Sequence, residues 1–258
     1  MKLRGYLAVA AVCLGLVVSD AIQRFVVSPW VKLRPSRRIP VLTRWIKMLA
    51  WLTTRPLVFI GGARLQVPPC VVPSAPGTLI LMNHQSLFDI PLVVQTVRDG
   101  YPLIVTRARY SRFVPLISHL IRLYQYPVVD PTANRRELRE SIDSLGERGR
   151  NSEVPIAMFP EGTRTKNGDI GRFKSAGMKR LLSERTWVVH IFVTDGLWSI
   201  SKFKDFIKGM AEIDGKVVHV GTLEWTDVEA DPDGFIAETR DMMVAGMDEL
   251  RSGGTRPA

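Results

Sequence analysis

The residues that could do chemistry gather in one short segment, residues 83–89, where His84 precedes Asp89 by five positions. A histidine and a carboxylate at this separation can fold back on one another across a turn. His84 is then a candidate general base and Asp89 the group that orients it, as in a serine triad, although no serine nucleophile stands in an obvious place. The imidazole suits proton transfer because its ordinary pKa, about 6.5, lies near neutral pH. The simpler interpretation makes Asp89 a helix cap and His84 a polar loop residue.

The elements around this segment favour the chemical interpretation. Residues 78–82 form an apolar run that predicts a buried strand, and a helix is expected to begin at Asp89. His84 would lie on the loop at the carboxyl end of that strand, where open α/β sheets place their functional groups. A second apolar run, residues 154–158, leads into Phe-Pro-Glu-Gly-Thr-Arg at residues 159–164. The sequence therefore predicts two polar loops, each placed after a buried strand.

Together these two segments resemble the glycerolipid acyltransferase family, typified by 1-acyl-glycerol-3-phosphate acyltransferase. That family carries Asn-His-x4-Asp followed by Phe-Pro-Glu-Gly-Thr-Arg, and the resemblance extends over about residues 78–196. It implies that His84 takes the proton of an acceptor hydroxyl, which attacks the thioester carbonyl of an acyl donor, while Asp89 fixes the tautomer. No covalent acyl-enzyme is then required, and neither a metal nor a cofactor is expected. The donor, acyl-CoA or acyl-carrier protein, is a co-substrate.

The resemblance also implies a set of substrate-binding residues, namely Asn83, Phe159, Pro160, Glu161, Gly162, Thr163, Arg164 and Lys174. Arg164 offers a planar fork suited to phosphate, and Gly162 allows close backbone approach. The alternative is a structural turn in which Glu161 and Arg164 pair at the surface. Lys174 belongs to a Phe-Lys-x-Gly-like segment and is expected either to contact phosphate or to be a solvated residue before a helix. The other histidines, His119, His190 and His219, are expected to be core or surface residues.

The chain departs from the family pattern where the acceptor phosphate is held. The second family block ends in Asp-Arg, whereas this chain has Asp130-Pro131, with Arg135 or Arg136 as possible substitutes. The block also has Gln125 where the family has glycine, and residues 188–193 lack the two prolines of the fourth block. The preferred acceptor is 1-acyl-sn-glycerol-3-phosphate. Another lysolipid, or a lipid-binding protein that has lost turnover, is the alternative.

Charge and aromatic content indicate a membrane partner. The net charge is +10, and residues 21–88 contain no acidic side chain. Tryptophan and aliphatic residues interleave with the arginines there, which favours a lipid interface over nucleic acid. The expected partners are membrane lipids and the acyl donor, not nucleic acid. Cys13 and Cys70 show neither disulfide nor metal spacing.

The N-terminal segment is expected to anchor the chain. Its apolar run, residues 5–18, would be about 21 Å long as a helix, shorter than the roughly 30 Å of a bilayer core, and Asp20 would close it. Pro29, Pro35 and Pro40 are expected to break the region before a second helix over residues 41–52. Basic residues on both flanks favour a monotopic or re-entrant anchor on the cytoplasmic face of the cell membrane over a crossing. A signal peptide is the competing interpretation, but no cleavage site follows.

Beyond residue 77, strand and helix patterns alternate. This alternation predicts an α/β fold of the glycerol-3-phosphate acyltransferase type, a layered and mostly parallel or mixed sheet with helices on both faces. The expected strands are residues 78–82, 103–106, 126–129, 154–159, 187–193 and 216–225, and the expected helices are 89–98, 111–123, 134–147, 175–183 and 233–250. We expect a membrane-associated helical segment at 1–56, the acyltransferase domain at 57–251 and a flexible tail at 252–258.

Overall fold

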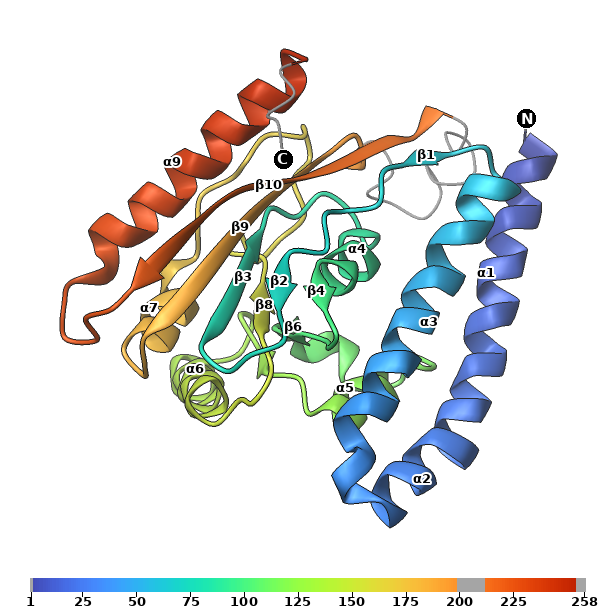
Figure 1. Cartoon of the computed structure of the whole chain (residues 1–258), viewed down its shortest axis with the longest axis horizontal. Coiled ribbons are helices and arrows are strands. Elements are labelled where there is room, and N and C mark those ends of the chain that lie inside the picture. The colour runs from blue at the N-terminus through green and yellow to red at the C-terminus, as the bar shows by residue number, and fades with distance from the viewer. Residues whose placement is uncertain (1, 199–211, 254–258) are drawn as a thin grey trace.

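A six-stranded mixed sheet forms the centre of the protein. The computed structural model describes residues 2–198 and 212–253 (Figure 1). The strand order is β1-β10-β9-β3-β8-β5, and every neighbouring pair is parallel except β9 and β10. The strands are β1 (Arg64–Leu65), β3 (Thr78–Met82), β5 (Leu103–Ile104), β8 (Ile156–Met158), β9 (Trp187–Asp195) and β10 (Asp214–Trp225). The predicted layered α/β fold is therefore confirmed, and five of the six expected strands lie in this sheet, whereas the strand expected at residues 126–129 pairs outside it.

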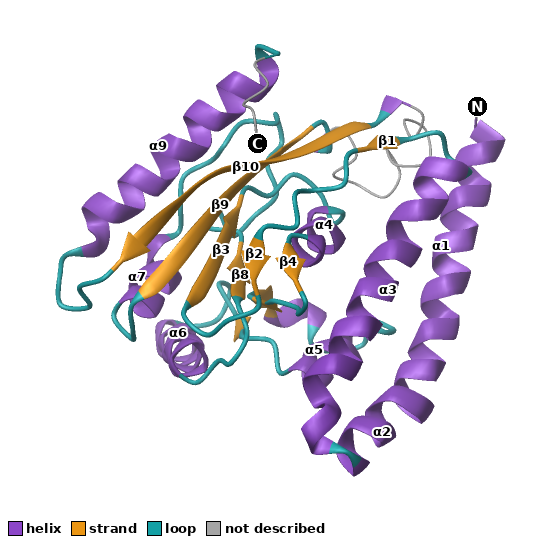
Figure 2. Ribbon diagram, in the orientation of Figure 1, coloured by secondary structure: helices purple, strands orange, loops and turns teal. Residues whose placement is uncertain are grey.

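The middle strands are apolar because helices cover both faces of the sheet. All five residues of β3 and all three of β8 are buried, as expected for parallel strands between two helical layers. Helices α7 (Ser175–Leu182) and α9 (Pro232–Arg251) lie against one face, where Trp225 Nε1 donates to Leu182 O and the Trp225 ring meets Phe235. Helix α4 (Asp89–Gln95) lies on the other side (Figure 2).

Two predicted helices are shorter than expected. The helix at residues 89–98 ends at Gln95, because Val97 and Arg98 form strand β4 (Val97–Arg98) beside β2 (Val72–Pro73). The helix at 111–123 begins only at α5 (Ile117–Tyr124). Phe113 and Leu116 before it have φ of 59° and 60°, a backbone conformation that a helix excludes. Helix α6 (Arg135–Arg150) and the paired strands β6 (Thr106–Arg107) and β7 (Val128–Val129) complete this region.

The N-terminal region is one long helical hairpin. Helix α1 (Lys2–Ile22) continues through a π-helical turn (Gln23–Val27) into α2 (Ser28–Leu33), and a short 3₁₀ turn leads to α3 (Arg38–Phe59). Asp20 closes the apolar run but not the helix, which continues past it, and its carboxylate pairs with Arg24 one turn later. Pro29 does not break the helix either, because it follows the π-helical turn and the backbone stays helical at Val27 and Ser28 before it.

Length therefore no longer argues against a membrane crossing. Residues 3–33 make one helical stretch of 31 residues that contains an 18-residue window with a mean hydropathy of 2.0, so the stretch is long and apolar enough to span a bilayer. The second helix is also longer than the predicted 41–52, and the expected domain boundary at residue 56 falls within α3.

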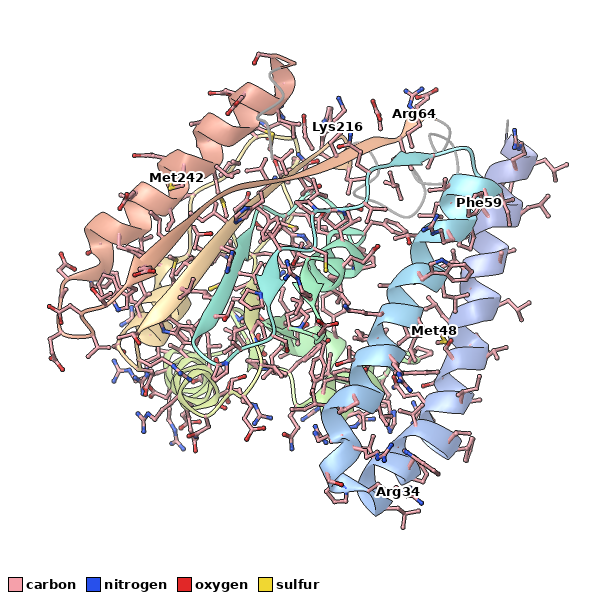
Figure 3. The ribbon with its side chains drawn as sticks, viewed as in Figure 1. Arg34, Met48, Phe59, Arg64, Lys216 and Met242 are labelled. Carbon is pink, nitrogen blue, oxygen red and sulfur yellow. The ribbon has the colours of Figure 1, made fainter. Side chains whose placement is uncertain are left out.

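Buried polar contacts fix the hairpin to the α/β domain. Gln23 is fully buried, accepts a hydrogen bond from Trp45 Nε1 at 2.8 Å and donates to the carbonyl of Leu116 at 3.3 Å. The hydroxyl of Tyr124 donates to Leu42 O at 2.7 Å. Figure 3 shows α1 outside α3, which lies between it and the sheet. The hairpin is thus held along its length, and α1 presents its other side outward.

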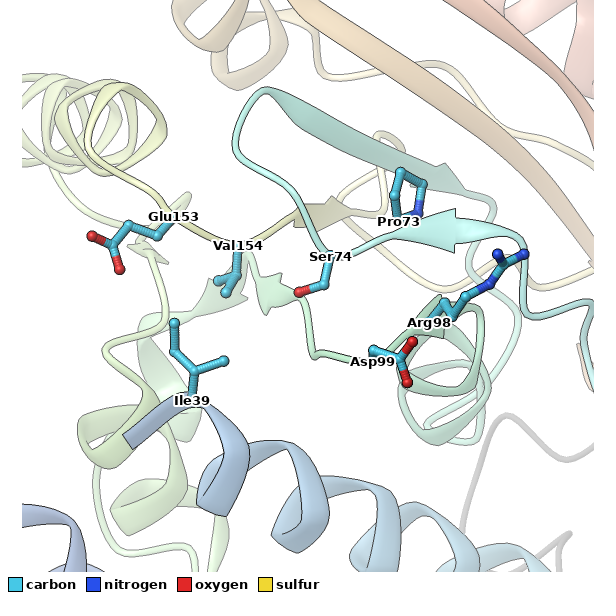
Figure 4. A pocket seen from close by; sticks show the side chains of 7 residues that line it. All are labelled: Ile39, Pro73, Ser74, Arg98, Asp99, Glu153 and Val154. Carbon is cyan, nitrogen blue, oxygen red and sulfur yellow. The ribbon is translucent and has the colours of Figure 1, made fainter. Parts of the chain in front are cut away.

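A cavity of about 330 Å³ opens at the amino ends of the strands (Figure 4). Ser74, Arg98, Asp99 and Val154 are among the residues that line it. Val154 precedes β8, whereas His84 follows β3, and these two strands are parallel. The cavity therefore lies at the opposite end of the sheet from His84.

Candidate active site

His84 and Asp89 meet at the carboxyl end of β3. His84 Nδ1 lies 2.7 Å from Asp89 Oδ2, and the Asp89 side chain is completely buried. The same oxygen accepts hydrogen bonds from the backbone N–H groups of Gln85 at 2.6 Å and Ser86 at 2.8 Å. Asp89 thus caps the loop that carries His84, whereas the simpler interpretation of the sequence has it cap the N–H groups of α4. Three donors on one oxygen hold the imidazole and the loop together.

The imidazole has one edge engaged and one face covered. When Nδ1–H donates to Asp89, the lone pair of Nε2 is left to accept a proton. The Phe159 ring stacks on His84 with the ring centroids 4.3 Å apart and the planes 23° from parallel. The His84 side chain is 16 % exposed, so it is sheltered but not sealed. The arrangement suits a general base at the rim of the sheet.

Glu161 braces the loop of His84 from the second motif. Its side chain is buried and accepts hydrogen bonds from the backbone N–H of His84 and of Gly171, both at 2.9 Å. Burial raises the pKa of Glu161, and the two backbone hydrogen bonds offset that effect only in part. The N–H of Thr165 donates to the carbonyl of His84 at 2.8 Å. Both carboxylate oxygens of Glu161 therefore accept hydrogen bonds from backbone N–H groups, and its contact with substrate stays a prediction.

Asn83 and Pro160 are likewise structural. The Asn83 amide bonds both backbone groups of Thr194 on β9, accepting from N–H at 2.7 Å and donating to C=O at 2.9 Å. Asn83 is 1 % exposed, and its contact with substrate stays a prediction. The carbonyl of Pro160 accepts from the N–H of Lys174 at 2.7 Å. These residues join the motif loops to one another and to the sheet.

The remaining predicted residues lie on the outer part of the second loop. Gly162 has φ of +64°, and a Cβ there would come within 2.9 Å of Lys174 Cδ, so the lysine side chain crosses the glycine. Thr163 is exposed and Arg164 is partly buried. The structure thus brings the two motifs together, and the cationic side chains of Arg164 and Lys174 lie on the outer part of the second motif loop.

The sequence did not predict three polar residues that lie near the two motif loops, namely Gln85, Asp195 and Arg251. Gln85 is fully buried, and its amide bonds Gly168 and Asp195, more than 80 residues further along the chain. Arg251 bonds the same two residues. The adjacency of Gln85 to His84 was the one available signal, because contacts over such separations leave no local pattern.

The other histidines serve packing, as predicted. His190 on β9 and His219 on β10 face each other, with Nδ1 and Nε2 3.4 Å apart. Burial and the neighbouring His219 lower the pKa of His190 to about 4. His119 Nδ1 lies 2.9 Å from Gln23 Nε2 in the hairpin contact.

A mixed sheet that brings a His–Asp pair beside a Phe-Pro-Glu-Gly-Thr-Arg loop defines the acyltransferase class. The model of the family described as "Acyltransferase" matches residues 64–192, half of the 258 residues, and the chain belongs to that family. The match covers both motifs and the strands that carry them.

Two proteins illustrate the similarity. A 1-acyl-sn-glycerol-3-phosphate acyltransferase of Cocos nucifera is 26% identical over 148 residues, 57% of this chain and 44% of that protein. The chain therefore spans less than half of that relative. The crystal structure of the 1-acyl-sn-glycerophosphate (LPA) acyltransferase PlsC from Thermotoga maritima has a TM-score of 0.65 and 17% identity, covering 95% of this chain and 97% of the other. At this identity the likeness shows a shared fold.

Proposed function

We propose that this protein is a membrane-associated acyltransferase that moves a fatty acyl group from an acyl thioester to the free hydroxyl of 1-acyl-sn-glycerol-3-phosphate, giving phosphatidic acid. The observation that carries this proposal is the 2.7 Å contact between His84 and Asp89 beside the second motif. The Cocos nucifera relative and the Thermotoga maritima PlsC are both named for this acceptor, which supports its choice here.

The geometry suits direct transfer. His84 Nε2 takes the proton of the acceptor hydroxyl as its oxygen attacks the thioester carbonyl, and Asp89 stabilises the imidazolium that forms. The tetrahedral intermediate then expels the thiolate, which receives the proton from His84. The acceptor oxygen ends in the new ester and the donor leaves as a thiol, so the reaction calls for no metal and no cofactor. The donor is acyl-CoA or acyl-carrier protein.

Arg107 is our candidate for the phosphate contact that Pro131 cannot make. Strands β6 and β7 are parallel and in register with Arg107 beside Val129, two residues before Pro131. Arg107 is partly buried, and its Nε has no hydrogen-bond partner among the described residues. Arg136 is less suitable, because it pairs with Glu140 on the exposed face of α6. The partly exposed guanidinium of Arg107 lies near the position where the family has arginine and this chain has Pro131, and it suits an anionic head group.

The acceptor and donor can be tested together. Purified protein in detergent is given a labelled acyl donor, either acyl-CoA or acylated acyl-carrier protein. The acceptor is 1-acyl-sn-glycerol-3-phosphate, lysophosphatidylcholine or lysophosphatidylethanolamine, and the products are identified by mass spectrometry. We expect phosphatidic acid to form fastest. Because Pro131 replaces the family arginine, another lysolipid is the second candidate, and faster acylation of a zwitterionic lysolipid would favour it. No product from any pair would contradict the proposal.

The helical hairpin is our candidate for the membrane contact. Along α1, the π-helical turn and α2 the outward side chains are apolar and exposed, among them Leu3, Leu14, Val17, Phe25 and Leu33 at 63–80 %. Arg34 and Arg37 lie at the turn. Helix α1 packs along α3, and α3 is bound to the domain through Leu42 O, which accepts a hydrogen bond from the Tyr124 hydroxyl, so a crossing by α1 alone would strip that packing. A monotopic attachment on the cytoplasmic face fits this arrangement.

Cysteine labelling tests the attachment. The exposed native cysteines, Cys13 and Cys70, are first replaced, and single cysteines are placed at residue 2 or residue 36. An impermeant reagent should label both positions from the cytoplasmic side. Labelling from opposite sides would show a membrane span and overturn the monotopic attachment.

A further inference from the structure

Gln85 links the turn that carries His84 to residues near the carboxyl end of β9 and to the loop after the second motif. Its backbone N–H donates to Asp89 Oδ2 at 2.6 Å. Its side-chain amide donates to Gly168 O at 3.1 Å and to Asp195 Oδ1 at 3.0 Å, and accepts from the N–H of Leu197 at 3.0 Å. One fully buried residue thus fixes the His84–Asp89 turn to the end of β9 and to the loop that follows the second motif.

Arg251, the last residue of α9, holds the same two acceptors. Its Nη2 donates to Gly168 O at 2.9 Å and its Nε to Asp195 Oδ2 at 3.1 Å, while Nη1 lies 2.9 Å from Asp169 Oδ1. Burial tends to raise the pKa of Asp195, but hydrogen bonds from Arg251 and Gln85 outweigh it and the pKa is lowered. The carboxylate between Gln85 and Arg251 is therefore charged at neutral pH.

The backbone at Gly168 is shaped by this contact. Gly168 has φ of +90°, and a Cβ there would come within 2.8 Å of Trp198 Cδ1 and 2.9 Å of Arg251 Nη2. A side chain at this position would push the guanidinium away from the carbonyl that it binds. The glycine thus allows the end of α9 to close on the loop.

We propose that Gln85 and Arg251 are positioning residues for acyl transfer, which together fix the loop of residues 163–171 against the turn that carries His84. Neither touches the reacting atoms. Gln85 acts from inside the fold and Arg251 from the end of α9, through the Gly168 carbonyl and the Asp195 carboxylate. Their expected effect on kinetics rests on the proposed function, in which His84 is the base. A base misplaced by about an ångström slows the chemical step more than it weakens substrate binding.

The kinetic test compares Arg251→Ala and Arg251→Lys in the full chain. The matched control is Asp233→Asn, which removes an exposed ion pair with Lys179 at the other end of α9. We expect Arg251→Ala to lower kcat roughly tenfold, or up to a hundredfold, with KM little changed. In Arg251→Lys the loss of kcat should be smaller. Added guanidinium should restore part of the lost rate in Arg251→Ala and should not raise the rate of the other variants. An unchanged kcat in Arg251→Ala, or an equal loss in Asp233→Asn, would overturn the proposal.

A double variant tests whether the two residues act as a unit. Gln85→Met removes the amide but keeps a buried chain of similar length. Because Gln85 and Arg251 share their acceptors, the loss of kcat in Gln85→Met/Arg251→Ala should be smaller than the product of the two single losses. A loss equal to that product would contradict the shared role.

Hydrogen exchange separates this proposal from the proposed function. In Arg251→Ala the N–H groups of Gln85 and Ser86, which donate to Asp89, should exchange faster than in the native protein, whereas Asp233→Asn should leave them unchanged. Unaltered exchange at these two positions would reject the positioning role, even if the native protein transferred no acyl group. Should Arg251→Ala fail to fold, Arg251→Lys and Asp195→Asn provide the same readout.

Discussion

Two histidine pairs in this protein show how a partner decides what an imidazole does. His84 lies 2.7 Å from a buried carboxylate, on the loop at the carboxyl end of the central strand β3. His190 meets a second imidazole, His219, at 3.4 Å on the sheet itself. A carboxylate stabilises the imidazolium and fixes its tautomer, whereas a neighbouring imidazole and burial oppose protonation. The first pair can therefore carry a proton in catalysis, and the second is held neutral.

Removing the carboxylate should have the largest effect. In Asp89→Asn the amide NH₂ would face the backbone donors of Gln85 and Ser86, and the correct tautomer of His84 would lose its support. We expect kcat to fall on the order of 10⁴-fold, as for an orienting aspartate in a triad. Steady-state kinetics with saturating donor and acceptor measure this, with Asp143→Asn on α6 as the exposed control. A fall of less than about tenfold would remove the distinction between the two histidine pairs.

The next effect concerns the proposed phosphate contact of Arg107. If Arg107 holds the acceptor phosphate, Arg107→Ala should weaken acceptor use by about 2–3 kcal/mol, the usual cost of a charge-assisted hydrogen bond. The kcat/KM for 1-acyl-sn-glycerol-3-phosphate measures this, with Arg136→Ala as the control because its guanidinium pairs with Glu140. Equal effects of the two substitutions would show that Arg107 contributes only general charge.

The smallest effect is on stability and belongs to His190. Its pKa of about 4 in the folded protein lies below the ordinary value of 6.5, so the unfolded chain binds more protons between these values. Stability is therefore lost as the pH falls from about 6.5 towards 4, on the order of 1–2 kcal/mol at pH 5. Urea unfolding at pH 7.5 and pH 5 should show this loss in the native protein and a smaller one in His190→Phe. An equal loss of stability in the native protein and in His190→Phe would mean that folding does not lower the pKa of His190.

The sequence predicted what local pattern determines. The apolar run at 78–82 is β3 with identical bounds, and the spacing of His84 and Asp89 predicted their contact. The roles of Asn83 and Glu161 were not predictable, since both motif residues bond backbone groups that the fold brings near them, up to 111 positions away. The predicted break at Pro29 failed for a local reason. A π-helical turn precedes the proline, and the backbone before it stays helical.

The most direct test of the account is the rate of acyl transfer by His84→Ala. His84 is a loop residue whose removal leaves the buried core intact, so the variant should fold, which circular dichroism and thermal unfolding can verify. With saturating acyl-CoA or acyl-carrier protein and 1-acyl-sn-glycerol-3-phosphate, we predict at least a thousandfold loss of kcat, in the range found when a general base is removed. A folded His84→Ala protein that forms phosphatidic acid at the native rate would contradict the assignment of His84 as the base.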